Sequence, residues 1–340
     1  MSLPTPLHRA SPVTLEVRHD TLYRYDAAVS LAQHQAHLQP LADVAQRLLM
    51  HTLVVDPAPT FRRDSTDAMG NAQTHFSLTQ PHRTLRVSAV SRVEVSGRFD
   101  GLRPASSPAW EPLAASLRYG AAPAASAPGG APRFEPAVEF VPPSPYVPRL
   151  PALRAYALPS FPAGCPVAEA ALNLMHRLHA DFAYESQSTQ VDTPLAQVFA
   201  QRRGVCQDFA HLLIGGLRLL GLPARYVSGY LLTQPPEGGP PMLGADASHA
   251  WVQVWCPGTE VAGGTVDWLD LDPTNDLVPS TGHVRVAVGR DFGDVTPLRG
   301  VIRGGGRHVL SVGVSTRVID GAREGAGPHP APRRSGTVAQ

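Results

Sequence analysis

The sequence predicts an α+β fold in which an N-terminal antiparallel β domain precedes a domain of helices and strands. In the first 100 residues apolar and polar side chains alternate, as at Val13, Leu15 and Val17, which is the period of a half-buried strand. Residues 206–220 instead carry apolar side chains at four-residue spacing, which indicates an amphipathic helix. Short apolar segments come after it, and helices followed by strands are typical of α+β domains.

The N-terminal domain is assigned to residues 1–100. After the first strand, further short strands are predicted at 22–25, 53–55, 74–78 and 85–95. Turn signals such as Asp56-Pro57 and Gly70-Asn71 separate them. Several short strands at such spacing favour a sandwich or another small antiparallel domain.

Composition divides the rest of the chain into three parts. Residues 101–162 are rich in proline, and 121–132 are nearly all Ala, Pro, Gly and Ser, which is typical of a flexible connector. The second domain is assigned to residues 163–319. Residues 320–340 are polar, contain Pro and Gly, and are predicted to be a disordered tail.

The second domain is predicted to contain three helices and at least three strands. The helices are placed at 166–182, 194–200 and 206–220, the second capped by Thr193 with proline at its first position. The strands are placed at 224–232, 250–255 and 268–271, with two more at 284–288 and 309–318.

The composition excludes several functions. All 29 positively charged residues are arginine, so a Walker-type phosphate loop, a protein kinase, a pyridoxal-phosphate enzyme and a Schiff-base aldolase are excluded. A net charge of +1 gives no reason to expect nucleic acid or an anionic membrane as a partner. Without a secretory signal or a long apolar run, and with three cysteines, we expect a cytoplasmic protein with reduced thiols.

Cys206 opens the predicted helix 206–220 directly after Arg203-Gly204-Val205. The positive end of the helix dipole stabilises a thiolate there, and the thiolate is the nucleophilic form of cysteine. The first amide groups of a helix have no partner within it, so they are free to bind a developing oxyanion. A cysteine at this position is nevertheless often a small buried core residue.

His249 and Asp272 lie at the ends of two predicted strands. A histidine at the start of a strand can act as a base, and a carboxylate at the end of the next strand can orient it. Each residue alone is more often structural. Asp270 shares a strand face with Asp272 and is its rival for the orienting role, whereas Asp208 is expected to point outward and complement the helix dipole.

Other features have a functional and a structural interpretation. His176 and His179, three apart on a helix, are either metal ligands or a surface pair. The glycine run at 303–307 either binds an anion or forms a turn. Trp251 either lines a substrate cleft beside His249 or packs in the core. We expect no metal site and no cofactor.

The motifs around these residues resemble those of the bacterial transglutaminase-like superfamily. Residues 203–212 (RGVCQDFAHL) resemble its nucleophile motif, and residues 222–230 (LPARYVSGY) resemble the segment next to that motif on its C-terminal side. Residues 248–251 (SHAW) and 272–275 (DPTN) resemble its histidine and aspartate motifs, and 181–184 (DFAY) the stretch before the nucleophile. Upstream, residues 19–25, 38–40 and 70–71 more loosely resemble the N-terminal β region of this bacterial subfamily.

The resemblance implies a papain-like core in which the helix bearing the nucleophile packs on an antiparallel sheet, within residues 163–319. It assigns Cys206, His249 and Asp272 as nucleophile, base and orienter. Tyr184, Gln207 and Trp251 are further candidates for the oxyanion site and the cleft.

The implied activity is cysteine-dependent acyl transfer at a peptide or Gln-type amide, through a thioester on Cys206. The acceptor is water or an amine, so a peptide or protein substrate and an amine acceptor are the expected partners. A dedicated cysteine protease and a catalytically silent scaffold or binding module remain alternatives.

Overall fold

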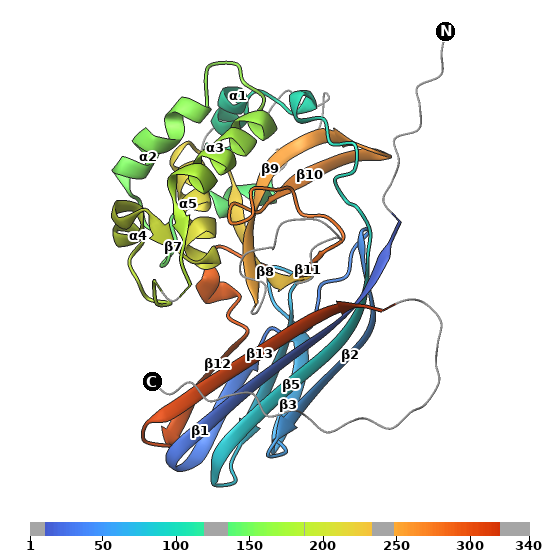
Figure 1. Cartoon of the computed structure of the whole chain (residues 1–340), viewed down its shortest axis with the longest axis vertical. Coiled ribbons are helices and arrows are strands. Elements are labelled where there is room, and N and C mark those ends of the chain that lie inside the picture. Colours follow the sequence, from blue (N-terminus) through green and yellow to red (C-terminus); the bar gives the residue numbers. More distant parts are fainter. Residues whose placement is uncertain (1–10, 119–134, 187, 233–247, 320–340) are drawn as a thin grey trace, which may run out of the picture.

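The computed structural model describes residues 11–118, 135–186, 188–232 and 248–319 (Figure 1). Helices are grouped on one side of a small sheet in the upper part of Figure 1, and long antiparallel strands form the lower part. The α+β fold class and the N-terminal antiparallel sheet predicted from the sequence are confirmed. Among the described residues, no helix is long and apolar enough to cross a membrane.

A single long strand, β1 (Val13–Ala36), organises the lower part. Its first half pairs on either side with β5 and β13, and its second half with β4 and β12, all antiparallel. The outer strands β2 and β3 pair with β5 and β4. These strands are β2 (Gln46–Asp56), β3 (Phe61–Thr66), β4 (Ala72–Leu78), β5 (His82–Val95), β12 (Leu298–Gly304) and β13 (His308–Val318).

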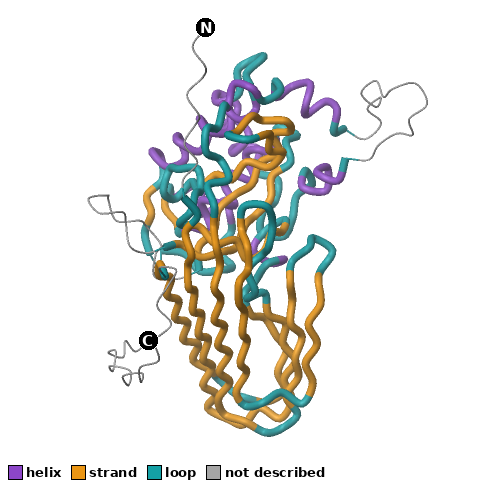
Figure 2. The backbone as a smooth tube through the Cα atoms, turned by 90° about the vertical axis from the view of Figure 1, so that its right-hand side faces the viewer, coloured by secondary structure: helices purple, strands orange, loops and turns teal. Residues whose placement is uncertain are grey.

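The two halves of β1 belong to two facing layers of strands (Figure 2). The pairing register shifts between Arg24 and Val29, where the strand passes from one layer to the other. Buried side chains from both halves form one core, which includes Ala32, Phe76 and Val87. The N-terminal part is therefore a sandwich closed at one end by the bend of β1.

The strands β12 and β13 lie within the sequence range that was assigned to the second domain, yet both pair with β1. The range 163–319 therefore includes two strands that belong to the N-terminal sheet. Of these two, β12 was not predicted as a strand. Strand propensity does not reveal which distant strand is the partner. The glycine run forms the turn between β12 and β13, with Gly304, Gly305 and Gly306 all at positive φ.

The upper part contains a second antiparallel sheet with the strand order β10-β9-β8-β11. Helix α5 packs against β8 and β9 and is covered by α2, α3 and α4. The strands are β8 (Ala224–Leu231), β9 (His249–Val261), β10 (Gly264–Leu271) and β11 (His283–Gly289). The helices are α1 (Trp110–Ser116), α2 (Pro151–Ala157), α3 (Val167–Asp181), α4 (Leu195–Gln201) and α5 (Cys206–Leu219).

Short elements complete this part. The two-residue strands β6 (Ala183–Tyr184) and β7 (Arg203–Gly204) pair in parallel. Four 3₁₀ helices are described, at Pro104–Ser106, Pro136–Phe140, Leu158–Ser160 and Phe292–Asp294. The helix α4 begins after Pro194 without the side-chain cap that was expected from Thr193, whose hydroxyl instead accepts a hydrogen bond from the Gln190 amide.

The stretch 101–162, which was predicted to be a connector, contributes to the core of the upper part. It supplies α1 and α2, and its residues Leu113, Leu153 and Phe161 are buried in the main cluster. Its high proline content suggested a loop, but well-separated large apolar side chains anchor it. The segment 121–132 and the predicted tail 320–340 lie outside the described residues.

The two parts are joined along the outer edge of β11 by two side-chain amides from the sandwich. Gln46 Oε1 accepts from the Arg285 amide (2.8 Å) and its Nε2 donates to the Arg285 carbonyl (2.7 Å). Asn71 does the same with Val288, at 2.8 and 2.7 Å. Both side chains are buried. Their amides pair with the backbone of β11 as a neighbouring strand would, so the amide and carbonyl groups at this edge do not need water as a partner.

Replacing Asn71 with alanine should therefore destabilise the protein strongly. The change leaves the buried amide and carbonyl of Val288 without partners, which costs about 2–5 kcal/mol in the free energy of unfolding. Urea denaturation followed by tryptophan fluorescence measures this, because Trp110, Trp251, Trp255 and Trp268 all lie in the upper part. A loss below about 0.5 kcal/mol, as at an ordinary surface site, would show that the edge is held by other means.

Stability should also fall in mild acid, because the buried histidines His19 and His211 favour the neutral form. Burial lowers the pKa of His19 to about 4 and that of His211 to about 3. An unfolded histidine titrates near pH 6.5, so their contribution is complete above about pH 6.5 and is lost as the pH falls towards 4. The urea midpoint should drop between pH 7 and 4.5. In His19→Gln the midpoint should depend less steeply on pH. If the midpoint of that variant depends on pH as steeply as that of wild type, His19 is not a source of the pH dependence.

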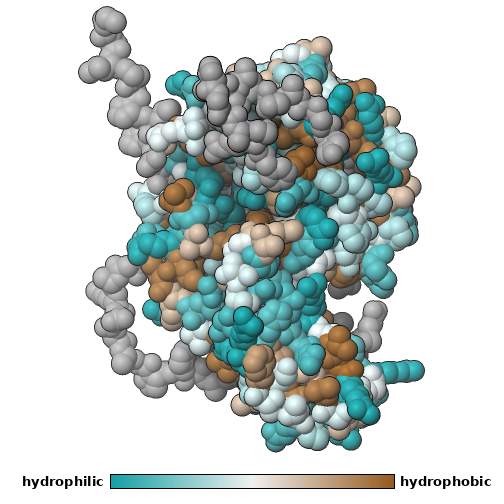
Figure 3. Space-filling view, turned by 180° about the vertical axis from the view of Figure 1, so that it is seen from behind, coloured by the Kyte–Doolittle hydropathy of each residue, from teal (hydrophilic) through white to brown (hydrophobic). Residues whose placement is uncertain are grey.

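The exposed surface mixes hydrophilic and hydrophobic side chains. Seen from behind, the apolar ones lie in small separate groups over both parts of the molecule (Figure 3). The exposed large apolar side chains include Val54 and Phe61 on β2 and β3, and Val301 and Val309 on β12 and β13. Scattered exposure of this kind is normal for a folded protein.

Candidate functional site

Cys206 is the first residue of α5, as the sequence predicted. The preceding helix α4 ends at Arg202, which adopts the left-handed conformation (φ 55°) and turns the chain back into β7. At Gly204 a Cβ atom would lie 2.7 Å from Asp208, so the approach to the helix requires glycine. This turn presents a partly exposed thiol at the positive end of a buried helix.

Asp208 does not point outward as expected. It is buried, and its carboxylate folds back to accept hydrogen bonds from the Val205 amide (2.9 Å) and the Thr189 hydroxyl. Burial raises its pKa despite these bonds. The side chain closes the first turn of α5. Its carboxylate is therefore engaged there and does not act as a second carboxylate beside Cys206.

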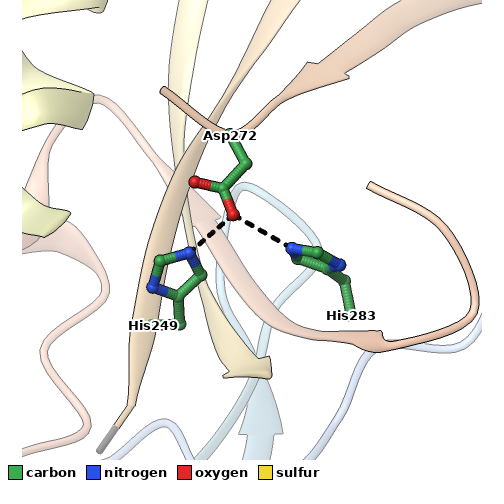
Figure 4. A group of neighbouring side chains, drawn as sticks. All are labelled: His249, Asp272 and His283. Atoms are coloured by element: carbon green, nitrogen blue, oxygen red, sulfur yellow. Dashed lines mark hydrogen bonds and ion pairs between the residues drawn. The ribbon is translucent and has the colours of Figure 1, made fainter. Parts of the chain in front are cut away.

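His249 and Asp272 meet across neighbouring strands (Figure 4). His249 opens β9, Asp272 follows β10, and His249 Nε2 lies 2.8 Å from Asp272 Oδ2 with both side chains fully buried. An ionised carboxylate only accepts hydrogen bonds, so Nε2 carries the proton and donates it. The tautomer of the neutral ring therefore has its lone pair on Nδ1.

The other nitrogen of His249 is the one available to Cys206. Nδ1 is buried and has no hydrogen-bond partner at standard geometry among the described residues. Burial alone would lower the pKa of His249, but the charges of Asp272 and then of Cys206 raise it above its usual value. Since Asp272 occupies Nε2, Nδ1 is the ring nitrogen left for an interaction with the Cys206 side chain.

Five hydrogen bonds hold the Asp272 carboxylate. Its Oδ1 accepts from the amides of Thr274 (3.0 Å) and Asn275 (3.2 Å). Its Oδ2 accepts from Asn275 Nδ2 (2.9 Å), His249 Nε2 (2.8 Å) and His283 Nε2 (3.1 Å). Burial opposes ionisation, yet the two histidines hold the pKa of this carboxyl far below its usual range.

The rival carboxylate, Asp270, makes different contacts. It is buried and accepts hydrogen bonds from Trp251 Nε1 (3.0 Å) and from the side-chain Nε2 of Gln253. Residues on one strand face point the same way, but they lie about 7 Å apart along the strand, so only one can reach His249. The structure gives that contact to Asp272.

The histidine pair on α3 contacts the loop that carries Asp272. His176 bonds to Asp276, and His179 Nδ1 lies 3.1 Å from the carbonyl of Thr274. Neither belongs to a group of three or more potential metal ligands in the described residues. The pair ties the Asp272 loop to α3, a role that the sequence did not suggest.

His283 is a site residue that the sequence analysis missed. It begins β11 and shares Asp272 with His249 (Figure 4). The sequence did offer one signal, because His283, like His249, stands at the start of a predicted apolar strand. It does not show, however, that β11 reaches Asp272.

In the described chain, His249, Asp272 and His283 are the one group with metal-ligand composition, with ligand atoms within 4.8 Å of one another. A carboxylate offers about four lone-pair positions, and five hydrogen bonds already use both oxygens of Asp272. The donor set therefore fits a hydrogen-bonded carboxylate better than a metal ion.

The three remaining candidates lie near the site in different ways. Tyr184 is partly exposed in β6, where it pairs with Gly204 just before the nucleophile. Gln207 donates from Nε2 to the Val191 carbonyl (3.1 Å). Trp251 is fully buried against Val227 and Val288, which fits the core-packing interpretation of this residue and not the cleft interpretation.

Comparison with known proteins identifies the family of this chain. Residues 162–273 match the model of the transglutaminase-like superfamily, and residues 15–94 match that of the bacterial transglutaminase-like N-terminal region. An uncharacterized protein of Mycobacterium tuberculosis is 42% identical over 286 residues, which are 84% of this chain and 86% of that protein. The chain belongs to the transglutaminase-like superfamily.

Two proteins that are similar to this chain carry functional names. A protein-glutamine gamma-glutamyltransferase of Pseudomonas aeruginosa is 33% identical over 104 residues, which cover 30% of this chain and 14% of that protein. A solved structure from Cytophaga hutchinsonii, described as a candidate cysteine protease, superposes with a TM-score of 0.70 at 21% identity and covers 93% of each chain. It confirms the predicted fold of both the sandwich and the transglutaminase-like core.

Proposed function

We propose that the protein catalyses acyl transfer from a peptide or Gln-type amide through a thioester on Cys206. The observation that carries this proposal is the state of His249, whose Nε2 is held by a buried carboxylate while its Nδ1 remains available on the side of Cys206. A thiol at a helix start, a polarised imidazole and a fixed carboxylate are the parts of a nucleophilic acyl-transfer site.

In the first half-reaction the Cys206 thiolate attacks the amide carbonyl carbon. The tetrahedral oxyanion is stabilised by amide groups at the start of α5, and Tyr184, beside Gly204, is the candidate for a second donor. The carbon–nitrogen bond then breaks, and the His249 imidazolium gives its proton to the leaving amine. The products are a thioester and a released amine.

In the second half-reaction His249 removes a proton from water or from an amine, which attacks the thioester. Water gives a carboxylic acid and regenerates the thiol, whereas an amine gives a new amide. The choice depends on whether the site excludes water and binds the amine. Both outcomes use the same residues of this chain.

Two other functions remain as alternatives. A dedicated cysteine protease would use the same first half-reaction with water as its acceptor, which is the activity suggested by the name of the Cytophaga structure. A silent scaffold or binding module would not need an available Nδ1 on His249 or a carboxylate held by five donors. The intact set of three residues therefore supports an enzyme.

A peptide library incubated with a tagged primary amine tests the proposal and separates the acceptors. Mass spectrometry should find hydrolysed or amine-capped products, and a Cys206→Ala sample should yield neither. The chain contains no lysine, so it cannot form Gln–Lys crosslinks with itself, and any captured side-chain amine comes from the tagged reagent or the library. Identical products from wild type and Cys206→Ala would overturn the proposal.

A further inference from the structure

His283 shares the Asp272 carboxylate with His249 in a fully enclosed arrangement. Two ring nitrogens converge on Asp272 Oδ2, with His249 Nε2 at 2.8 Å and His283 Nε2 at 3.1 Å (Figure 4). Because the carboxylate is ionised, both nitrogens must donate. The side chain of His283 is only 4% exposed, so water does not readily replace this bond.

The position of His283 is fixed from three sides. Its backbone amide donates to the Ser280 carbonyl (3.1 Å), and its ring stands edge-on to Trp251 at 5.2 Å between centroids. Two residues along β11, both backbone groups of Arg285 are held by the side-chain amide of Gln46. The sandwich therefore braces the strand that delivers His283 to Asp272.

We propose that His283 is a positioning residue for the acyl-transfer site, which fixes the Asp272 carboxylate in the orientation that His249 needs. This inference rests on the proposed function of Cys206 and His249. The backbone amides of the 274–275 loop hold Oδ1, whereas Oδ2 is held by Asn275 Nδ2 and by His283 Nε2 in addition to His249. Without the His283 bond, Asn275 Nδ2 is the one donor among the described residues that still restrains Oδ2 besides His249 itself, so the partner of His249 Nε2 is held less firmly.

Two substitutions separate the hydrogen bond from the packing of the ring. His283→Gln places an amide N–H near the position of Nε2 and keeps the bond but loses the aromatic ring. His283→Phe keeps an aromatic ring against Trp251 but removes the donor. If positioning through Asp272 matters, the glutamine variant should be the more active one, whereas a purely structural role favours the phenylalanine variant.

The probe is 4-nitrophenyl acetate, with release of nitrophenolate measured and the acetylated cysteine mapped by mass spectrometry. His283→Phe should lower kcat about 10–100-fold with little change in KM, by analogy with loss of other residues that orient a histidine. His283→Gln should stay within about threefold of wild type. The control His19→Gln removes another buried histidine, far along the chain and bonded to Tyr230, and should also keep its kcat.

The outcomes distinguish this inference from the function on which it rests. If wild type acetylates Cys206 and His283→Phe turns over as fast as wild type, the positioning role is wrong. The same conclusion applies if His283→Phe is at least as active as His283→Gln. If wild type forms no adduct on Cys206 at all, the proposed function itself fails. Urea midpoints of all variants show whether each remains folded.

Discussion

Replacing Cys206 with alanine is expected to lower the turnover of an amide substrate by about 10⁴-fold or more, as in other enzymes that lose their nucleophile. Alanine leaves no atom that can form the thioester, while the amide groups at the start of α5 and the pair His249–Asp272 stay in place. The thiol is partly exposed, and alanine is a good helix former, so the free energy of unfolding should change by less than about 1 kcal/mol.

The matched control for this change is Cys165→Ala. Cys165 is also partly exposed, and its thiol interacts with the carbonyl of Pro166. It lies before α3, at a position that the mechanism does not use. This variant should turn over substrate as wild type does. Amide turnover that survives in purified Cys206→Ala would remove this residue from the mechanism.

Replacing Asp272 with asparagine should lower turnover about 10²–10⁴-fold, because the uncharged side chain neither fixes the tautomer of His249 nor stabilises its imidazolium. The charge of Asp272 raises the pKa of His249, so its loss lowers that pKa. An imidazolium is needed to protonate the leaving amine, and the alkaline limb of the kcat/KM profile should therefore move to lower pH.

Asp270→Asn is the control for this second change. Asp270 lies two residues earlier and is also buried, but it bonds to Trp251 and Gln253 instead of His249. Its replacement should cost some stability and leave the alkaline limb unmoved. An equal shift of the limb in both variants would mean that the effect is a general loss of charge and not loss of the orienting carboxylate.

The sequence predicted the parts of the site that lie in short local motifs. Cys206 at a helix start, His249 at the start of a strand and Asp272 at the end of the next were each visible from neighbouring residues, and the structure places the last two in contact. The helix over 206–219 was predictable because its apolar stripe repeats within one element.

The features that escaped prediction depend on contacts between distant parts of the chain. His283 became a candidate only when β11 was seen beside β8. The pairing of β12 and β13 with β1 joins residues that are more than 250 positions apart in the sequence. Trp251 could have faced a cleft or the core. The alternation of side chains along a strand shows which residues share a face, but not what packs against that face. In the sequence Asn71 was interpreted as a turn residue. In the structure its side-chain amide bonds to the backbone of the edge strand β11.

The proposed function depends most on Cys206 being the activated thiol, and alkylation of the wild-type protein by iodoacetamide at about pH 6 tests this without any substrate. Burial raises the pKa of the Cys165 and Cys256 thiols, so both serve as internal controls. Peptide mapping should find Cys206 alkylated at least about tenfold faster than either, and this advantage should disappear in His249→Gln. Equally slow labelling of all three cysteines would contradict the account.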